Sequence, residues 1–181
     1  MIPTKAARRY SAALLGYALE TDSLESVLKD VQHVDETIRQ SRELLLFLRN
    51  PIVKPAKKSD VLKELFGKNV SEQMNSMFGL IAEKSRFDLL PGITHAFIEA
   101  YRKHKGIIVA EVFYADMPDE KQFEAIRKAI AARTGKTVEL VSKHKPDLVG
   151  GLVVKIDDTV IDGSVKHSLE QLEHLFLKAA I

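Results

Sequence analysis

The hydrophobic repeat of this chain changes once, near residue 106, and that change limits the folds it can adopt. Before it, apolar residues recur at the three- and four-residue spacing of amphipathic helices. After it, residues 107–114, IIVAEVFY, are mostly β-branched and aromatic, which favours a strand. Lys105-Gly106 lies between the two patterns and is expected to end the last helix. The sequence therefore predicts an α+β protein of two domains, residues 1–105 and residues 106–181.

The first domain is expected to be a bundle of six helices with short connections. Its first helix, residues 5–20, contains many small residues, which allow another helix to approach closely. Apolar residues spaced from Leu24 to Ile38 predict the second helix, with Asp22 as its N-cap. Residues 44–48 are entirely apolar, so the short third helix should be buried on most sides.

An exposed loop is expected next, because residues 49–60 contain two prolines and three lysines. The remaining three helices of this domain are recognised by apolar residues at helical spacing. These are Val61, Leu62, Leu65 and Phe66 in the fourth helix, Met74, Met77, Phe78 and Ile81 in the fifth, and Leu90, Ile93, Phe97 and Tyr101 in the sixth.

The second domain is predicted to be a small α/β unit of order β-α-β-β-β-α. After its first strand, Asp116 or Met117 should cap a helix that Gly135 ends. The stretches KTVELVS, GLVVKI and TVID predict three further strands. The last helix is expected to carry the apolar residues Leu169, Leu172, Leu175 and Phe176.

Residues 134–137 contain the GKT of a phosphate-binding loop but lack the rest of that motif. The loop needs a glycine at position 130, where this chain has Ile130, and it runs from a strand into a helix rather than the reverse. The chain has no cysteine, and its six histidines show no short zinc-binding spacing. We therefore expect no catalytic residue, no bound metal and no cofactor.

A second glycine-rich stretch, near the end of the chain, could cradle a phosphate or form a tight turn. Gly150 and Gly151 precede a strand instead of a helix, and Gly163 precedes the last helix without a second glycine. We interpret these glycines, with Asp162 and Ser164, as a structural motif in which Ser164 is the N-cap of the last helix.

Composition limits the possible partners. The formal net charge is +2, tryptophan is absent and aromatic residues make up 7%, which disfavours nucleic-acid binding. The longest run of aliphatic and aromatic residues, 44–48, is far too short to cross a bilayer. The first twenty residues show no signal peptide. We expect a soluble protein that acts through its surfaces.

VIDGSVK near the end of the chain and ARRYSAALLGYA near its start resemble segments of one family, the delta subunit of rotary F-type ATP synthases, the bacterial counterpart of the oligomycin-sensitivity-conferring subunit. VIDGSVK, residues 160–166, matches that family's C-terminal motif at every position. ARRYSAALLGYA, residues 7–18, is similar to its opening helix, and NPIV and LIAEKSRFDLLPGI are similar to its later turns. The turn Asp157-Asp158 departs from the Gly-Asp that is common in the family. The resemblance covers essentially the whole chain.

The resemblance implies a non-catalytic stator subunit of a multisubunit membrane complex, at the cytoplasmic face of the inner membrane. It implies that the helical domain binds the N-terminal helix of an alpha subunit in a groove between its first and fifth helices. The C-terminal domain would hold the end of the b-subunit stalk. The expected groove residues are Tyr10, Ala13, Leu14, Tyr17, Met74, Met77, Phe78 and Ile81.

Two alternatives remain at this point. One is a nucleotide-binding enzyme that uses Asp162-Gly163-Ser164 in the α/β domain, although the missing glycines argue against it. The other is an RNA-associated module that uses Arg8, Arg9 and the lysines of residues 54–58, against which the charge and the few aromatic residues argue.

Overall fold

The computed structural model describes residues 3–67 and 69–179, with side chains as far as residue 172. Over these residues the protein is of mixed α+β class, with eight α-helices and one four-stranded sheet. It divides into two compact units, Met1–His104 and Lys105–Ile181, here called the N-terminal unit and the C-terminal unit. Each unit has a hydrophobic core of its own.

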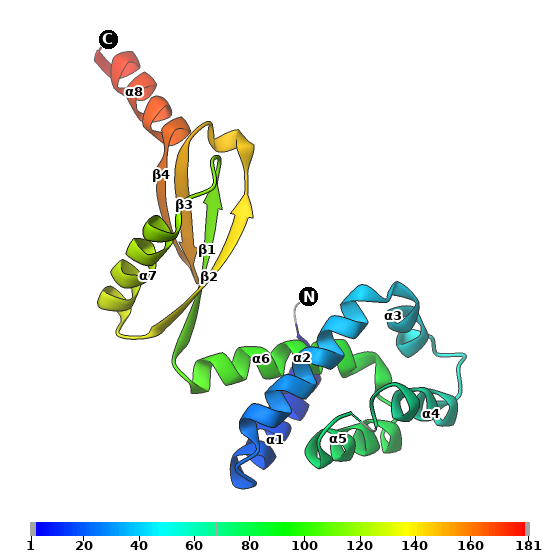
Figure 1. Ribbon diagram of the computed structural model, residues 1–181. Coiled ribbons are helices and arrows are strands. Elements are labelled where there is room, and N and C mark those ends of the chain that lie inside the picture. The colour runs from blue at the N-terminus through cyan, green and yellow to red at the C-terminus, as the bar shows by residue number, and fades with distance from the viewer. Residues whose placement is uncertain (1–2, 68, 180–181) are drawn as a thin grey trace. The chain divides into compact units, whose positions relative to one another are not determined.

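The N-terminal unit is entirely helical (Figure 1). Its helices are α1 (Lys5–Glu20), α2 (Leu24–Gln40), α3 (Arg42–Arg49), α4 (Pro55–Phe66), α5 (Glu72–Glu83), the short η1 (Phe87–Leu89) and α6 (Leu90–His104). Helix α6 packs against α1 and α2, while α5 packs against α1, α2 and α4. Helices α1 and α6 approach closely, since a Cβ at Gly92 would lie only 3.2 Å from the Cβ of Ala7.

The prediction that Asp22 caps the second helix is wrong. Asp22 has a left-handed backbone, with φ of 49°, and Ser23 occupies the N-cap position of α2 without a side-chain cap bond. The amide of Ser23 donates to the carbonyl of Ala18 at 2.9 Å. A hydrogen bond from an amide to the carbonyl five residues earlier, next to a residue in the left-handed conformation, is typical of a helix C-terminus. Asp22 therefore belongs to the turn that ends α1, and α2 begins after it at Ser23.

Two other predictions for this unit fail. Residues 49–60 are not a loop throughout, because α4 begins at Pro55, whose missing amide hydrogen is tolerated in a first turn. Lys58 is buried and its Nζ donates to the Leu48 carbonyl at 2.7 Å. In α3 only Leu44 and Leu48 are buried, while Leu46 is 57% exposed, because one face of this short helix remains open.

The C-terminal unit contains the sheet. Its elements are β1 (Ile107–Tyr114), α7 (Glu120–Thr134), β2 (Thr137–His144), the short η2 (Pro146–Leu148), β3 (Gly151–Ile156), β4 (Thr159–Ser164) and α8 (Val165–Ala179). The strand order is β2-β1-β3-β4 (Figure 1). Strands β1 and β2 are parallel, as the crossover through α7 requires, and the other two pairings are antiparallel.

The core of the C-terminal unit is formed by Ala110, Val112, Val138, Val154 and Ile130, the last from α7. The N-cap of α7 is Asp119, not Asp116 or Met117, because Asp119 and Gln122 form a reciprocal capping box. Gly135 ends the helix as predicted, with φ of 67°.

The apolar residues predicted for the last helix are described only in part. Leu169 and Leu172 lie on α8 as expected and are 56% and 49% exposed. Leu175 and Phe176 lie outside the residues whose side chains are described.

Candidate functional site

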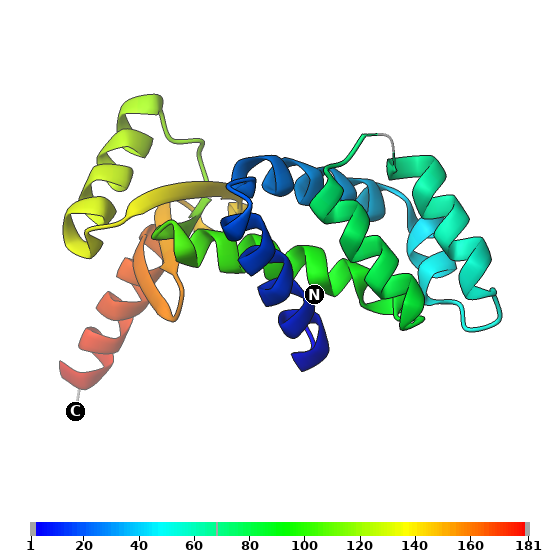
Figure 2. The same cartoon turned by 90° about the horizontal axis from the view of Figure 1, so that it is seen from below.

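Helices α1 and α5 lie side by side in the N-terminal unit (Figure 2). At one end of the pair, Nε2 of Gln73 on α5 lies 3.1 Å from Oγ1 of Thr21, the residue that follows α1. At the other end, Tyr10 on α1 and Lys84 after α5 line the same cleft. These two links mark where the two helices come near each other at the surface of the unit.

Residues at helical spacing from these links define what we call the α1–α5 face. It consists of Ala6, Tyr10, Ala13 and Tyr17 from α1, and of Gln73, Met77, Leu80 and Lys84 from the α5 side. On α1, alanines alternate with tyrosines, so that small and large side chains follow one another along the helix. Tyr17 is 38% exposed and Leu80 is 37% exposed, and both are apolar surface without a neighbour that covers them fully.

The eight residues expected to form a groove differ in solvent exposure and fall into two groups. Ala13 and Tyr17 are exposed and Tyr10 is half-buried. The other five belong to the core of the N-terminal unit: Leu14, Met74, Met77, Phe78 and Ile81. Since these five already pack against other helices, they can hold α1 and α5 in place but offer little free surface.

Four residues of the α1–α5 face are not among the expected groove residues: Ala6, Gln73, Leu80 and Lys84. Leu80 was missed because it lies beside the apolar stripe of α5 rather than in it. The apolar stripe marks the buried face, whereas a surface for a partner begins at the edge of that stripe. Gln73 and Lys84 occur on the same side of the helix as Leu80, at the spacing i, i+7 and i+11, and this spacing could have identified them.

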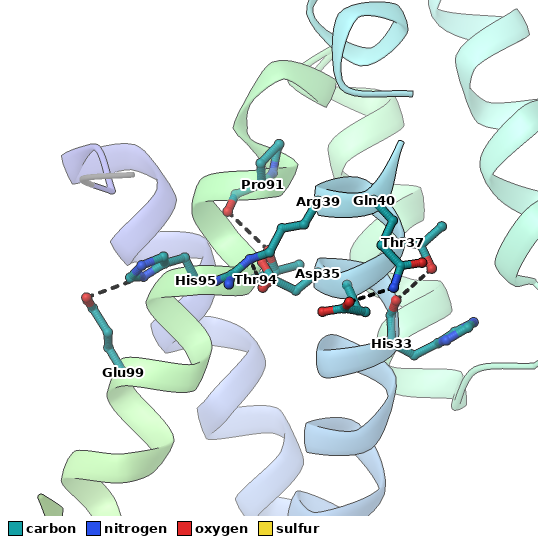
Figure 3. Close-up of polar contacts among 10 residues, drawn as sticks. His33, Asp35, Thr37, Arg39, Gln40, Pro91, Thr94, His95 and Glu99 are labelled. Carbon is teal, nitrogen blue, oxygen red and sulfur yellow. Dashed lines mark hydrogen bonds and ion pairs between the residues drawn. The ribbon is translucent and has the colours of Figure 1, made fainter. Parts of the chain in front are cut away.

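A buried polar contact joins α2 to α6 within the same unit (Figure 3). The hydroxyl of Thr94, which is fully buried, donates to Oδ1 of Asp35 at 2.8 Å and lies 3.1 Å from the Pro91 carbonyl. The other carboxylate oxygen of Asp35 lies 2.8 Å from Nε of Arg39, one turn along α2. Both oxygens of this buried carboxylate therefore have partners, and α6 is fixed against α2.

The glycine-rich motif of the C-terminal unit lies where β3 begins and β4 leads into α8. Gly151 has φ of 74° and pairs with Ser164 across the β3–β4 ladder. A Cβ on Gly151 would lie 2.3 Å from the carbonyl oxygen of Gly163, and one on Gly150 would lie 3.0 Å from a methyl of Val165. Both glycines are thus needed for close packing against the start of α8.

Two of the amide groups at the start of α8 already have acceptors. The amide of Val165 donates to the Gly150 carbonyl at 3.0 Å, and the amide of His167 donates to Oγ of Ser164 at 3.2 Å, the N-cap geometry. Ser164 is itself buried. A phosphate at this turn would have to displace these bonds, so the geometry offers no support for nucleotide binding here.

The carboxylate of Asp162 accepts a hydrogen bond from the amide of Ser164 at 2.9 Å. This bond, with a smaller contribution from the Ser164 side chain, holds the pKa of Asp162 below its ordinary value of 3.8. Because the folded state binds this proton less tightly than the unfolded state, the ionised carboxylate stabilises the fold above pH 3.8. That contribution is lost as pH falls through the lower, folded-state pKa.

We therefore expect Asp162→Asn to lower the urea midpoint of the C-terminal unit at pH 7, and the difference from the unmodified protein to shrink below pH 3.8. Urea titrations at pH 7, 5, 4 and 3 measure this. Asp158→Asn is the matched control, because Asp158 is exposed in the neighbouring turn. Equal pH dependence of the two variants would contradict the assignment.

No group of His, Cys, Asp or Glu side chains in the described residues is placed to hold a metal ion. No helix in the described part of the chain combines the length and the apolar composition needed to cross a bilayer.

Comparisons with known proteins agree over nearly the whole chain. The model of the ATP synthase delta (OSCP) subunit family matches residues 6–176. ATP synthase subunit delta of Chlorobaculum parvum is 38% identical over 168 residues, 93% of each chain. Subunit delta of Desulforamulus reducens is 36% identical over 173 residues, 96% of each chain. A chain of the Toxoplasma gondii mitochondrial ATP synthase hexamer, solved by cryo-EM, aligns with a TM-score of 0.73 and 25% identity, covering 96% of this chain and 98% of that one.

These matches span both units, and the resemblance seen in the two ends of the sequence is confirmed. The chain belongs to the delta (OSCP) subunit family of ATP synthases, whose members are structural, non-catalytic components of the peripheral stalk.

Proposed function

We propose that this subunit connects two other subunits and resists the torque of the rotor. In this proposal the N-terminal unit binds the amphipathic N-terminal helix of an alpha subunit, and the C-terminal unit holds the end of the b-subunit stalk. The protein then lies at the cytoplasmic face of the inner membrane, attached through its partners. Such a role needs slow dissociation and stiffness rather than chemistry, because each contact must outlast many catalytic cycles.

The proposal assigns one partner to each part of the chain. Residues 1–105 act as a six-helix bundle and residues 106–181 as an α/β domain of order β-α-β-β-β-α. The division of the chain at His104 and Lys105, and the separate cores of the two units, support this assignment.

The observation that carries the proposal is the α1–α5 face. An incoming helix packs best where small side chains leave room for it and large ones surround it, and the alternation of Ala6 and Ala13 with Tyr10 and Tyr17 has this form. Leu80 adds apolar surface on the α5 side. A helix-in-groove interaction uses such a surface, with anchors of the partner at i, i+4 and i+7.

For the C-terminal unit, the supporting observation is a set of exposed apolar side chains on β4 and the start of α8. They are between 44% and 57% exposed: Val160, Ile161, Val165, Leu169 and Leu172. Large apolar side chains left exposed on neighbouring elements are candidates for a protein–protein contact. It is the part of the unit that we assign to the b-subunit stalk.

We expect this protein to bind a synthetic peptide with the sequence of the N-terminal segment of the organism's own alpha subunit. Tyr17→Ala should weaken the affinity for this peptide about tenfold and Leu80→Ala about fivefold, because both changes remove apolar contact area at the α1–α5 face. Calorimetric titration measures the affinity, and a negative heat-capacity change should accompany binding.

Leu19→Ala is the matched control, because Leu19 is also on α1 and is 42% exposed, but lies on the opposite side of the helix from Tyr17. It should leave the affinity within twofold. Equal effects of Leu19→Ala and Tyr17→Ala would place the peptide elsewhere. Absence of binding to the folded protein would remove the alpha-subunit assignment.

A further inference from the structure

A cleft of about 360 Å³ lies at one end of the α1–α5 face. It is lined by Ala6, Arg9, Tyr10, Lys84, Arg86 and Leu89. Three of these six side chains are cationic and none is acidic. Three of the residues, Ala6, Tyr10 and Lys84, also belong to the α1–α5 face, so that the cleft continues that face at the N-terminal end of α1.

The positive charge of the cleft is only weakly compensated within the protein. Among the described residues, the guanidinium groups of Arg9 and Arg86 have no hydrogen-bond or ion-pair partner. Lys84 pairs with Glu83 at 2.7 Å, but both side chains are more than half exposed, so this bond is screened by water. The hydrogen bond and the charge of Glu83 raise the pKa of Lys84, so the ammonium is charged at neutral pH.

The start of α1 adds to this potential. The N-terminal end of a helix carries a partial positive charge, and an acidic residue in the first turn usually offsets it. Helix α1 has no acidic residue in its first turn. Its Thr4 cap satisfies the Ala7 amide at 3.2 Å without adding charge. Ala6 and Leu89 supply the apolar part of the cleft lining beside these exposed cations.

We propose that this cleft binds a carboxylate side chain of the helical partner that lies along the α1–α5 face. This inference rests on the proposed function and adds to it a site with a defined chemistry. A carboxylate can accept two parallel hydrogen bonds from an arginine, so Arg9 or Arg86 would fix its position as well as its charge. Since the cleft lies at only one end of the face, this contact sets the direction and the register of the partner helix.

Charge variants of the full chain test the proposal, with the alpha-subunit N-terminal peptide as the probe. At 20 mM salt, Arg86→Gln and Arg9→Gln should each weaken binding about fivefold, and at 500 mM salt the loss should fall to about twofold. Arg42→Gln is the control, because Arg42 is an exposed cation on α3 that does not line the cleft. It should change the affinity less than twofold at either salt concentration.

Peptides in which each Asp or Glu is replaced by Asn or Gln, one at a time, locate the carboxylate. One of these replacements should weaken the binding of the peptide to the unmodified protein about fivefold. The same replacement should not further weaken its binding to the Arg86→Gln variant, because the partner of the carboxylate is already absent there. If the peptide binds and Tyr17→Ala weakens it, but Arg9→Gln and Arg86→Gln behave like Arg42→Gln, the cleft inference is wrong and the proposed function stands. If the unmodified protein does not bind the peptide, both are wrong.

Discussion

Gly151→Ala is expected to destabilise the C-terminal unit by about 3 kcal/mol or more. Two costs combine at this position. The backbone is left-handed, with φ of 74°, which an alanine adopts at a cost of about 1–2 kcal/mol. The added Cβ would also lie 2.3 Å from the Gly163 carbonyl oxygen, and backbone in a β-ladder cannot move aside as a side chain can.

Gly135→Ala separates these two costs. Gly135 is also left-handed, with φ of 67°, but a Cβ there would have no atom within 4 Å. The control should therefore lose only about 1 kcal/mol, the backbone part of the cost. Because the chain has no tryptophan, the measurement is urea unfolding followed by circular dichroism, with hydrogen exchange to localise the change.

In Gly151→Ala, exchange should accelerate in β3 and β4 and remain unchanged in α1 to α6, which belong to the other unit. Equal destabilisation by the two glycine variants would show that the close approach of Gly151 to Gly163 is absent in solution.

The elements that the sequence predicted best are those with a strong repeat or an unambiguous stop signal. The strand at residues 107–114 and the helix end at Gly135 agree with the structure. The N-caps of the helices were predicted less well. Asp22 and Asp119 are each followed three residues later by a Glu or Gln, so the sequence around them is alike. Only the structure distinguishes a left-handed Asp22 that ends one helix from an Asp119 that begins another.

Exposure was the property that periodicity could not supply. An apolar stripe shows which residues share a side of a helix, but not how much of that side a neighbour covers. Met74 and Ile81 are completely buried, whereas Leu46 and Leu169 are more than half exposed. Lys58 was expected to be exposed and is buried. A lysine in a proline-rich segment is usually solvated, but the Nζ of Lys58 donates to a buried carbonyl. The candidate site therefore needed the packing of α1 against α5 before its free surface could be identified.

Thr94→Val should lower the stability of the N-terminal unit by about 1.5–3 kcal/mol, the range for losing a hydrogen bond to a charged group. Valine has nearly the same shape as threonine, so the packing of this fully buried position is kept while the donor to Asp35 is removed. Among the described residues, the carboxylate then keeps only Arg39 as a side-chain partner, and the Arg39 side chain is largely exposed. A buried carboxylate with one oxygen unsatisfied is costly, and this is the source of the expected loss.

Thr37→Val provides the matched control, because Thr37 is on α2 and its hydroxyl donates to the His33 carbonyl at 2.8 Å on the exposed side of the helix (Figure 3). The same chemical change should there cost less than about 0.5 kcal/mol, since water replaces the lost donor.

A double-mutant cycle of Thr94→Val with Asp35→Ala measures the interaction between the two residues. The free energies of unfolding of the two single variants should be coupled by about 1 kcal/mol or more. Additive effects would mean that Thr94 and Asp35 do not interact. Coupling would show that this contact fixes α6 against α2, and therefore supports α1, which packs on α6 and carries one side of the α1–α5 face.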